Sequence, residues 1–188
     1  MEFDQPCFNI TSHAKVTGMV NEARRESNSL TLLSLYYVAQ AANDVEAFRL
    51  RLEDGKVVRY DKIFPGSTVL HDDDSFGFAY FPHTDDKEYF LTEGRKIADR
   101  QKKEKSFSPG TIHNGLIHCS IIPWVKLTSF QHAKNSKGDH SIPKIVIGKI
   151  YQENNEYWMP ISVEVHHALV DGLHVGKYFE VLEQLCNT

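Results

Sequence analysis

The chain has 188 residues, of which 41% are apolar and 24% are charged. At this length a folded chain buries roughly 70% of its unfolded surface, so this globular composition excludes a disordered protein and requires no metal or disulfide to hold a core. The net charge of −4 is the opposite of the basic balance typical of duplex nucleic-acid binders, so no nucleic-acid partner is expected.

The N-terminus is an extended segment around Pro6, with two acids and no basic stretch ahead of an apolar run, so it is not a signal peptide. No stretch approaches the ~20 apolar residues that cross a bilayer. The chain has three cysteines, which form no C-x-x-C pair: Cys7, Cys119 and Cys186. We therefore expect a soluble cytoplasmic protein with neither a disulfide framework nor a thiolate metal site.

Helical periodicity dominates the first quarter of the chain. Residues 17–27 are predicted to form a short helix capped by Thr17, and residues 29–48 a second helix. The apolar positions of the second helix extend beyond one stripe, which indicates a well-buried helix. Asp54-Gly55, between two apolar segments, predicts a hairpin.

The middle of the chain alternates between turn, strand and helix signals. Asp72–Asp74 predicts a turn, and residues 76–81 a strand that ends at Pro82. Residues 85–105 form the longest predicted helix, with Tyr89, Phe90 and Ile97 toward the core. Its basic residues are expected to form a solvated face: Arg95, Lys96, Arg100, Lys102, Lys103 and Lys105.

The C-terminal half is predicted to be mostly strands, at residues 116–122, 145–152 and 157–167. Asn154-Asn155 is a hairpin turn, residues 131–143 are an exposed loop, and residues 173–185 are a final helix. This order indicates one α/β (α+β) domain over residues 1–188, a two-layer sandwich in which helices cover a mixed sheet.

The strand that ends at His167 carries the chain's sharpest chemical signal. Side chains alternate across a strand, so His167 shares a face with Val163 and Val165, where solvent is expected to be scarce. A neutral imidazole is what a general base needs. Asp171 follows four residues later, with Gly172 free to take a positive φ. The alternatives are an ordinary core histidine or a metal site, although adjacent strand histidines point to opposite faces.

Several segments of the chain resemble chloramphenicol acetyltransferases, of the CoA-dependent acyltransferase superfamily. The resemblance extends from about Pro6 to Cys186 and rests on motifs in the family's order. They are His166-His167-Ala168-x-x-Asp171-Gly172-x-His174-Val175-Gly176, Ile122-Pro123-Trp124-Val125 followed by Ser129-Phe130, Gly148-Lys149 and Pro160, and more loosely Pro6-Cys7 and Ala39-Gln40-Ala41.

The resemblance implies catalytic roles for two residues. His167 corresponds to the family's general base, which takes a proton from a substrate hydroxyl as that hydroxyl attacks the thioester of acetyl-CoA. Ser120 corresponds to the hydroxyl that stabilises the oxyanion, and its plain alternative is an ordinary strand serine. Asp171 and Gly172 correspond to structural supports of the histidine loop. No metal is expected, and acetyl-CoA is a co-substrate rather than a tightly bound cofactor.

The resemblance also implies two binding regions and an assembly. Trp124 and Lys149 correspond to positions near CoA; the plain alternatives are core packing for Trp124 and a solvated charge for Lys149. The family's acceptor pocket corresponds to Cys7, Phe8, Phe76 and Phe107. Phe78 is bulky where the family has a small residue, and Ile150 stands where an aromatic is common. Family members are homotrimers with active sites between subunits.

These implications predict an antibiotic-resistance O-acetyltransferase that acts on chloramphenicol or a similar small alcohol. The alternatives are a dihydrolipoyl acyltransferase-like catalytic domain and a non-catalytic ligand-binding relative. Family members also carry an N-terminal segment whose arginine pairs with the buried motif aspartate. We therefore expect either that residues upstream of Met1 are missing from the chain as given or that Lys15 or Arg24 has become the partner of Asp171.

Overall fold

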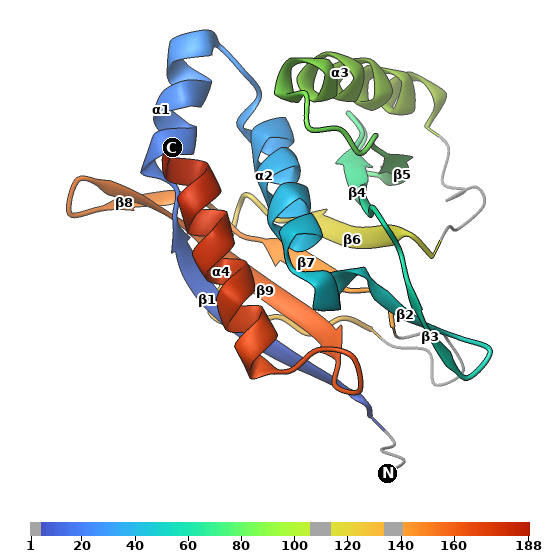
Figure 1. Cartoon of the computed structure of the whole chain (residues 1–188). Coiled ribbons are helices and arrows are strands. Elements are labelled where there is room, and N and C mark those ends of the chain that lie inside the picture. The colour runs from blue at the N-terminus through green and yellow to red at the C-terminus, as the bar shows by residue number, and fades with distance from the viewer. Residues whose placement is uncertain (1–4, 106–113, 134–140) are drawn as a thin grey trace.

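The computed structural model describes residues 5–105, 114–133 and 141–188. Its centre is a mixed sheet with the strand order β1-β9-β7-β6-β4-β5, in which β8 also pairs with β9. Helices pack on one face of this sheet (Figure 1), so the predicted two-layer α/β architecture is confirmed. The strands of this sheet are β1 (Cys7–Lys15), β4 (Phe64–Leu70), β5 (Phe76–Tyr80), β6 (Leu116–Ile121), β7 (Lys144–Ile147), β8 (Tyr151–Glu153) and β9 (Glu156–His166).

The four α-helices lie where the sequence predicts them: α1 (Thr17–Glu26), α2 (Leu30–Asp44), α3 (Lys87–Glu104) and α4 (Gly172–Asn187). The second predicted helix, residues 29–48, is too long, because Val45 is extended and a separate 3-10 helix follows at Glu46–Arg49. The predicted cap at Thr17 is wrong, because Val16 occupies the cap position and the Thr17 hydroxyl accepts a hydrogen bond from Tyr157 N–H at 2.9 Å. Tyr89 was expected in the core but is 51% exposed, whereas its neighbour Phe90 is buried.

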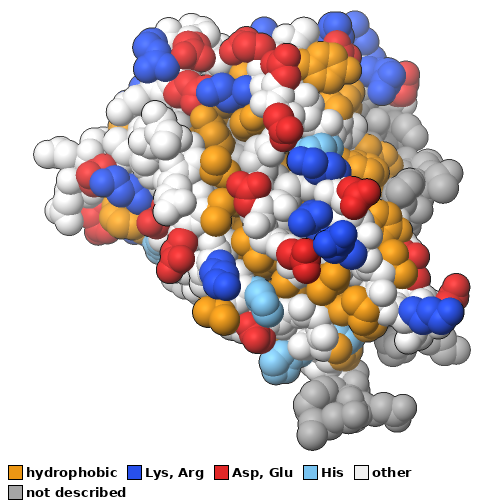
Figure 2. All heavy atoms as spheres, viewed as in Figure 1, with side chains coloured by type: hydrophobic (Ala, Val, Ile, Leu, Met, Phe, Trp, Pro, Cys, Tyr) orange, Lys and Arg blue, Asp and Glu red, His pale blue; other side chains and the backbone are white. Residues whose placement is uncertain are grey.

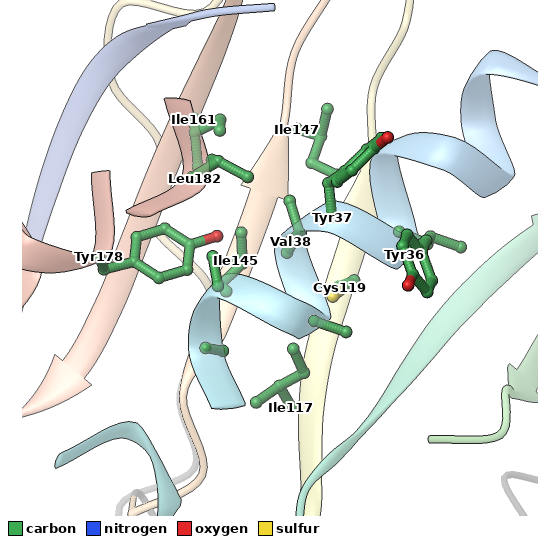
Figure 3. Packing of buried hydrophobic residues seen from close by; sticks show 14 of the residues in the cluster. Tyr36, Tyr37, Val38, Ile117, Cys119, Ile145, Ile147, Ile161, Tyr178 and Leu182 are labelled. Atoms are coloured by element: carbon green, nitrogen blue, oxygen red, sulfur yellow. The ribbon is translucent and has the colours of Figure 1, made fainter. Parts of the chain in front are cut away.

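The core lies between α2, α4 and the inner face of the sheet. Figure 3 shows Val38 of α2 pointing at isoleucines from three adjacent strands, with Tyr178 of α4 beside them. The labelled residues of this cluster are almost inaccessible to solvent, and they are Tyr36, Tyr37, Val38, Ile117, Cys119, Ile145, Ile147, Ile161, Tyr178 and Leu182. Helix α2 is therefore the central buried helix that its widened apolar stripe predicted.

The helix-covered side of the molecule carries mixed charge at its surface. In Figure 2, Lys and Arg side chains alternate with Asp and Glu over the helices, and apolar atoms lie between them in small areas. Within the described residues, no helix is long and apolar enough to cross a membrane.

The two predicted hairpins are confirmed. β2 (Leu50–Glu53) and β3 (Lys56–Arg59) pair on either side of Asp54-Gly55. β8 and β9 flank Asn154 and Asn155, whose φ angles of 50° and 63° are those of a tight hairpin turn.

The predicted strand over residues 145–152 is wrong, because it is two strands separated at Gly148. A Cβ on Gly148 would lie 2.8 Å from Leu127, so only glycine permits this close approach. The Lys149 N–H then donates to the Val125 carbonyl at 2.8 Å. After Gly148 the chain therefore leaves β7 and forms a backbone hydrogen bond with Val125, in the segment that follows β6.

Two further regions differ from the prediction. Strand β4 was not predicted at all, although it lies inside the sheet between β5 and β6. Residues 141–143, predicted as part of an exposed loop, are buried, and residues 134–140 of that loop lie outside the described residues.

A buried arginine joins the small hairpin to the main sheet. Arg51 of β2 is fully buried, and its guanidinium donates to four backbone carbonyls: Phe48, Leu50, Asn114 and Leu116, at 2.7–2.8 Å. These bonds fix the start of β6, and with it the strand that carries Ser120.

Candidate active site

The motif histidine lies one residue beyond the end of β9. The His167 N–H donates to the Pro6 carbonyl at 2.8 Å, and the turn closes through Val170 N–H to the His166 carbonyl at 3.0 Å. The His167 side chain is exposed and contacts Phe8 edge-on, with ring centroids 5.1 Å apart. The expectation that solvent is scarce around His167 is therefore wrong within this chain, because burial ends with the strand.

The contacts of His167 favour one tautomer of its neutral ring. Its Nδ1 lies 3.4 Å from the Val170 carbonyl oxygen, which can only accept a hydrogen bond. In the neutral ring a proton on Nδ1 suits this contact and leaves Nε2 with a lone pair. A lone pair on Nε2 is what a general base requires.

Asp171 is an exposed helix cap rather than a buried ion. Its carboxylate accepts from Leu173 N–H at 3.0 Å and His174 N–H at 3.2 Å, while its own N–H donates to His174 Nδ1. The bond from His174 N–H and the nearby His174 ring lower the pKa of Asp171 below its ordinary value. This capping box begins α4.

Because the Asp171 carboxylate is exposed, it needs no buried basic partner in this chain. Lys15 pairs with Glu156 at 2.6 Å, and the Arg24 guanidinium lies over the Tyr157 ring, so neither has replaced an arginine at Asp171. Gly172 does not adopt the expected positive φ, because it is the first residue of α4.

Ser120 opens into a cavity on the face of the sheet opposite the helices. This cavity has a volume of about 310 Å³ and is walled by β4, β5, β6 and β7, and by residues 132 and 133. Besides Ser120, its polar lining includes Ser67, Thr68, His118 and Lys144. Phe78 and Tyr80 of the edge strand β5 form its aromatic wall.

Trp124 lies at a second cavity, of about 570 Å³, between α2, α3 and the ends of β4 and β6. Its indole is 64% exposed, so Trp124 is not a packing residue of the core. Arg95 and Lys102 of α3 also line this cavity, so the basic face of α3 is not merely solvated. Lys149 is exposed, and its backbone N–H donates to the carbonyl of Val125, the residue after Trp124.

The two cavities share part of one wall. Ser67 and Thr68, successive residues of β4, line both, because their side chains leave the strand on opposite faces. Sequence analysis missed these two residues together with β4, since Pro65 and Gly66 argue against a strand. The strand-forming residues Thr68 and Val69, followed by Leu70, were the local signal that could have predicted β4.

The predicted acceptor-pocket residues are dispersed. Cys7 and Phe8 line a third cavity, of about 480 Å³, together with Glu164. Phe76 is 44% exposed and contacts Phe78 edge-on, with ring centroids 6.0 Å apart, so it borders the Ser120 cavity through Phe78. Phe107 lies outside the described residues.

His167 and Ser120 do not meet within one chain. Ser120 lies opposite Val146 on β7, and Val146 lies opposite Ser162 on β9. Ser162 precedes His167 by five residues. With a rise of ~3.3 Å per residue and ~4.8 Å between strands, this register separates them by about 20 Å. Ser120 lies within β6, whereas His167 lies in the turn that follows β9.

The arrangement of a mixed sheet, one helical layer and a histidine turn after the longest strand is that of the CoA-dependent acyltransferases. A solved chloramphenicol acetyltransferase has the same fold, with a TM-score of 0.85 and 27% identity, over 98% of this chain and 90% of that one. A dihydrolipoamide acetyltransferase of Azotobacter vinelandii shares the fold at a TM-score of 0.74 and 14% identity, over 97% and 82% of the two chains.

The chain belongs to the chloramphenicol acetyltransferase family, whose sequence model matches residues 2–183. Chloramphenicol acetyltransferase 3 of Escherichia coli is 29% identical over 186 residues, which cover 97% of this chain and 87% of the relative. A chloramphenicol acetyltransferase of Klebsiella sp. is 28% identical, over 97% and 84% of the two chains. The protein is therefore an acetyl-CoA-dependent acyltransferase.

Proposed function

We propose that this chain transfers the acetyl group of acetyl-CoA to a hydroxyl of chloramphenicol or of a similar small molecule. The observation that carries the proposal is the pair of cavities that share Ser67 and Thr68, one beside Ser120 and the other beside Trp124. The two cavities lie on either side of β4 and have Ser67 and Thr68 in common, so they offer separate sites for acceptor and CoA, which supports a ternary complex.

In this mechanism His167 Nε2 takes the proton of the acceptor hydroxyl, and the hydroxyl oxygen bonds to the thioester carbon. The Ser120 hydroxyl donates to the oxyanion of the tetrahedral intermediate. When the carbon–sulfur bond breaks, the CoA thiolate leaves and receives the proton from His167. Trp124, Arg95 and Lys102 line the second cavity, and Lys149 bonds the residue that follows Trp124. These side chains would hold CoA, because cationic groups suit its phosphates.

The acceptor is identified by release of the CoA thiol. We expect acetyl-CoA to release free thiol in the presence of chloramphenicol or another small alcohol at more than ten times the rate without acceptor, since general-base catalysis alone contributes ~10²–10⁴-fold. The measurement is thiol titration over a panel of alcohols and thiols. Absence of acceptor-dependent release over the whole panel would contradict the proposed function and favour a ligand-binding relative.

We further propose that the chain works as a homotrimer in which His167 faces the acceptor pocket of a neighbouring subunit. The support is the separation of His167 from Ser120 within one chain and the exposure of the imidazole. Light scattering at micromolar protein should give three times the chain mass of 21.5 kDa. A mass equal to one chain, together with full activity, would rule out a shared site.

Mixing two inactive variants tests the shared site directly. His167→Ala and Ser120→Ala chains, unfolded and refolded together, should regain about a quarter of wild-type activity, because one site in four then draws both intact groups from different subunits. Either variant refolded alone is the control. If the mixture is no more active than these controls, both groups come from the same subunit.

A further inference from the structure

The cavity beside Ser120 has one lysine and two imidazoles in its walls. Among its described lining residues, three are basic, namely His118, His132 and Lys144, and none is aspartate or glutamate. Lys144 pairs with Glu164, whose Oε1 lies 3.5 Å from Lys144 Nζ, and the Glu164 side chain is only 3% exposed whereas that of Lys144 is 18% exposed. Lys144 is therefore the charge that this cavity presents to a ligand.

The sheet places these charges in a row. Glu164, Lys144 and His118 are direct cross-strand neighbours on β9, β7 and β6. Glu164 lines the cavity of Cys7 and Phe8, on the side of Lys144 away from Ser120. An anion that entered beside His118 would thus meet the Lys144 ammonium before the Glu164 carboxylate. The anion and Glu164 would then contact the ammonium from opposite sides.

His118 is held in its neutral form chiefly by burial and secondarily by the charge of Lys144. Burial first, then the charge of Lys144 and the neighbouring His132 and Arg51, lower the pKa of His118 to about 4. His118 is therefore neutral at pH 7 and keeps one ring N–H that can donate to an anion, while Lys144 supplies the charge.

We propose that the acceptor of this enzyme is a small hydroxylated molecule that bears an anionic group, a carboxylate or a phosphate, which Lys144 and His118 bind. This inference rests on the acetyl transfer of the proposed function, and it names an anionic alcohol as acceptor in place of chloramphenicol, which carries no carboxylate or phosphate. Ser120 lies two residues from His118 on the same face of β6, about 7 Å away along the strand. The reacting hydroxyl and the anionic group should be separated by a similar distance.

The remaining walls limit the size and shape of this acceptor. The volume of about 310 Å³ is at the small end of ligand sites. Phe78 and Tyr80 provide an aromatic surface between the anion-binding end and Ser120. A single ring with a hydroxymethyl group and an acid at opposite ends matches these requirements.

The test is a calorimetric titration with two probes of equal shape, 4-(hydroxymethyl)benzoate and 4-(hydroxymethyl)benzamide, without acetyl-CoA. We expect the acid to bind ~10–100-fold more tightly than the amide, which is the worth of a hydrogen bond to a charged group. Lys144→Met should bind both probes equally. A third probe, 4-(hydroxymethyl)phenyl phosphate, distinguishes a phosphate acceptor, which would bind more tightly than the benzoate, from a carboxylate acceptor.

Two further variants keep the result interpretable. Lys144→Met removes the ammonium that pairs with the buried Glu164 carboxylate, which could disturb the fold. Lys144→Met/Glu164→Gln removes both charges and should show the same loss of preference. Lys56→Met, at an exposed position on the β2–β3 hairpin, is the matched control and should retain the preference. Equal binding of the two probes to wild type, binding of neither probe, or a preference that survives both Lys144 variants would overturn the inference.

Thiol release with the same probes separates this inference from the proposed function. If the benzoate binds through Lys144 but no alcohol in the panel promotes thiol release, the anion site stands and acetyl transfer fails. If chloramphenicol is acetylated and the benzoate does not bind, acetyl transfer stands and the anionic acceptor is wrong.

Discussion

Replacement of His167 by alanine should lower kcat by ~10²–10⁴-fold, because the acceptor hydroxyl would lose its general base. The fold should survive, since the His167 side chain is exposed and its main structural bond, from its backbone N–H to the Pro6 carbonyl, does not involve the imidazole. The measurements are steady-state thiol release and far-ultraviolet circular dichroism on the same preparation.

His166→Ala is the matched control for this substitution. The His166 ring accepts from Ala168 N–H at 3.2 Å, and strand alternation places it on the opposite face from His167. Its loss should affect kcat far less than the loss of His167. A greater loss of turnover in His166→Ala than in His167→Ala would show that the base has been assigned to the wrong residue of the pair.

Replacement of Arg51 by methionine should destabilise the fold by about 3 kcal/mol or more, because buried carbonyl groups would lose charged donors without access to water. The guanidinium bonds four carbonyls at 2.7–2.8 Å and joins the β2–β3 hairpin to the start of β6. Urea unfolding at one fixed protein concentration measures the change, since an oligomer's apparent stability depends on concentration.

Arg59→Met, on the same hairpin, is the control for Arg51→Met. Arg59 is exposed and pairs with Glu46 at 3.1 Å on the surface, so its replacement should change stability by less than about 1 kcal/mol. If the two variants unfold at the same urea concentration, the four carbonyl bonds do not contribute to stability as argued. Reduced activity in Arg51→Met at low urea would also follow from displacement of the strand that carries Ser120.

Most elements could be predicted from the sequence, because their signals are local. The periodicity of α2, the turn residues at Gly55 and Asn155, and the apolar segments of β6 and β9 each act over a few neighbouring residues. The family could also be identified from the sequence, because the histidine motif and the Pro123-Trp124 segment occur in the family's order.

Interactions between distant segments decided the features that the sequence analysis missed. β4 contains Pro65 and Gly66, yet it is a strand because β5 and β6 pair with it on both sides. The 145–152 segment divides because Gly148 packs under Leu127, which is 21 residues away in the sequence. Neither partner can be read from the local pattern.

The sequence by itself determined which residue types this protein has for its chemistry, and only the tertiary structure decided where they lie. Two motifs made His167, Ser120 and Trp124 candidate site residues, but alternation along one strand could not show that burial stops at His166 or that β7 separates His167 from Ser120. Asp171 was expected to be a buried ion and is an exposed helix cap. Burial and proximity depend on strands and helices far apart in the chain, and for that reason only the folded sheet brings Lys144, His118 and Ser120 to one cavity.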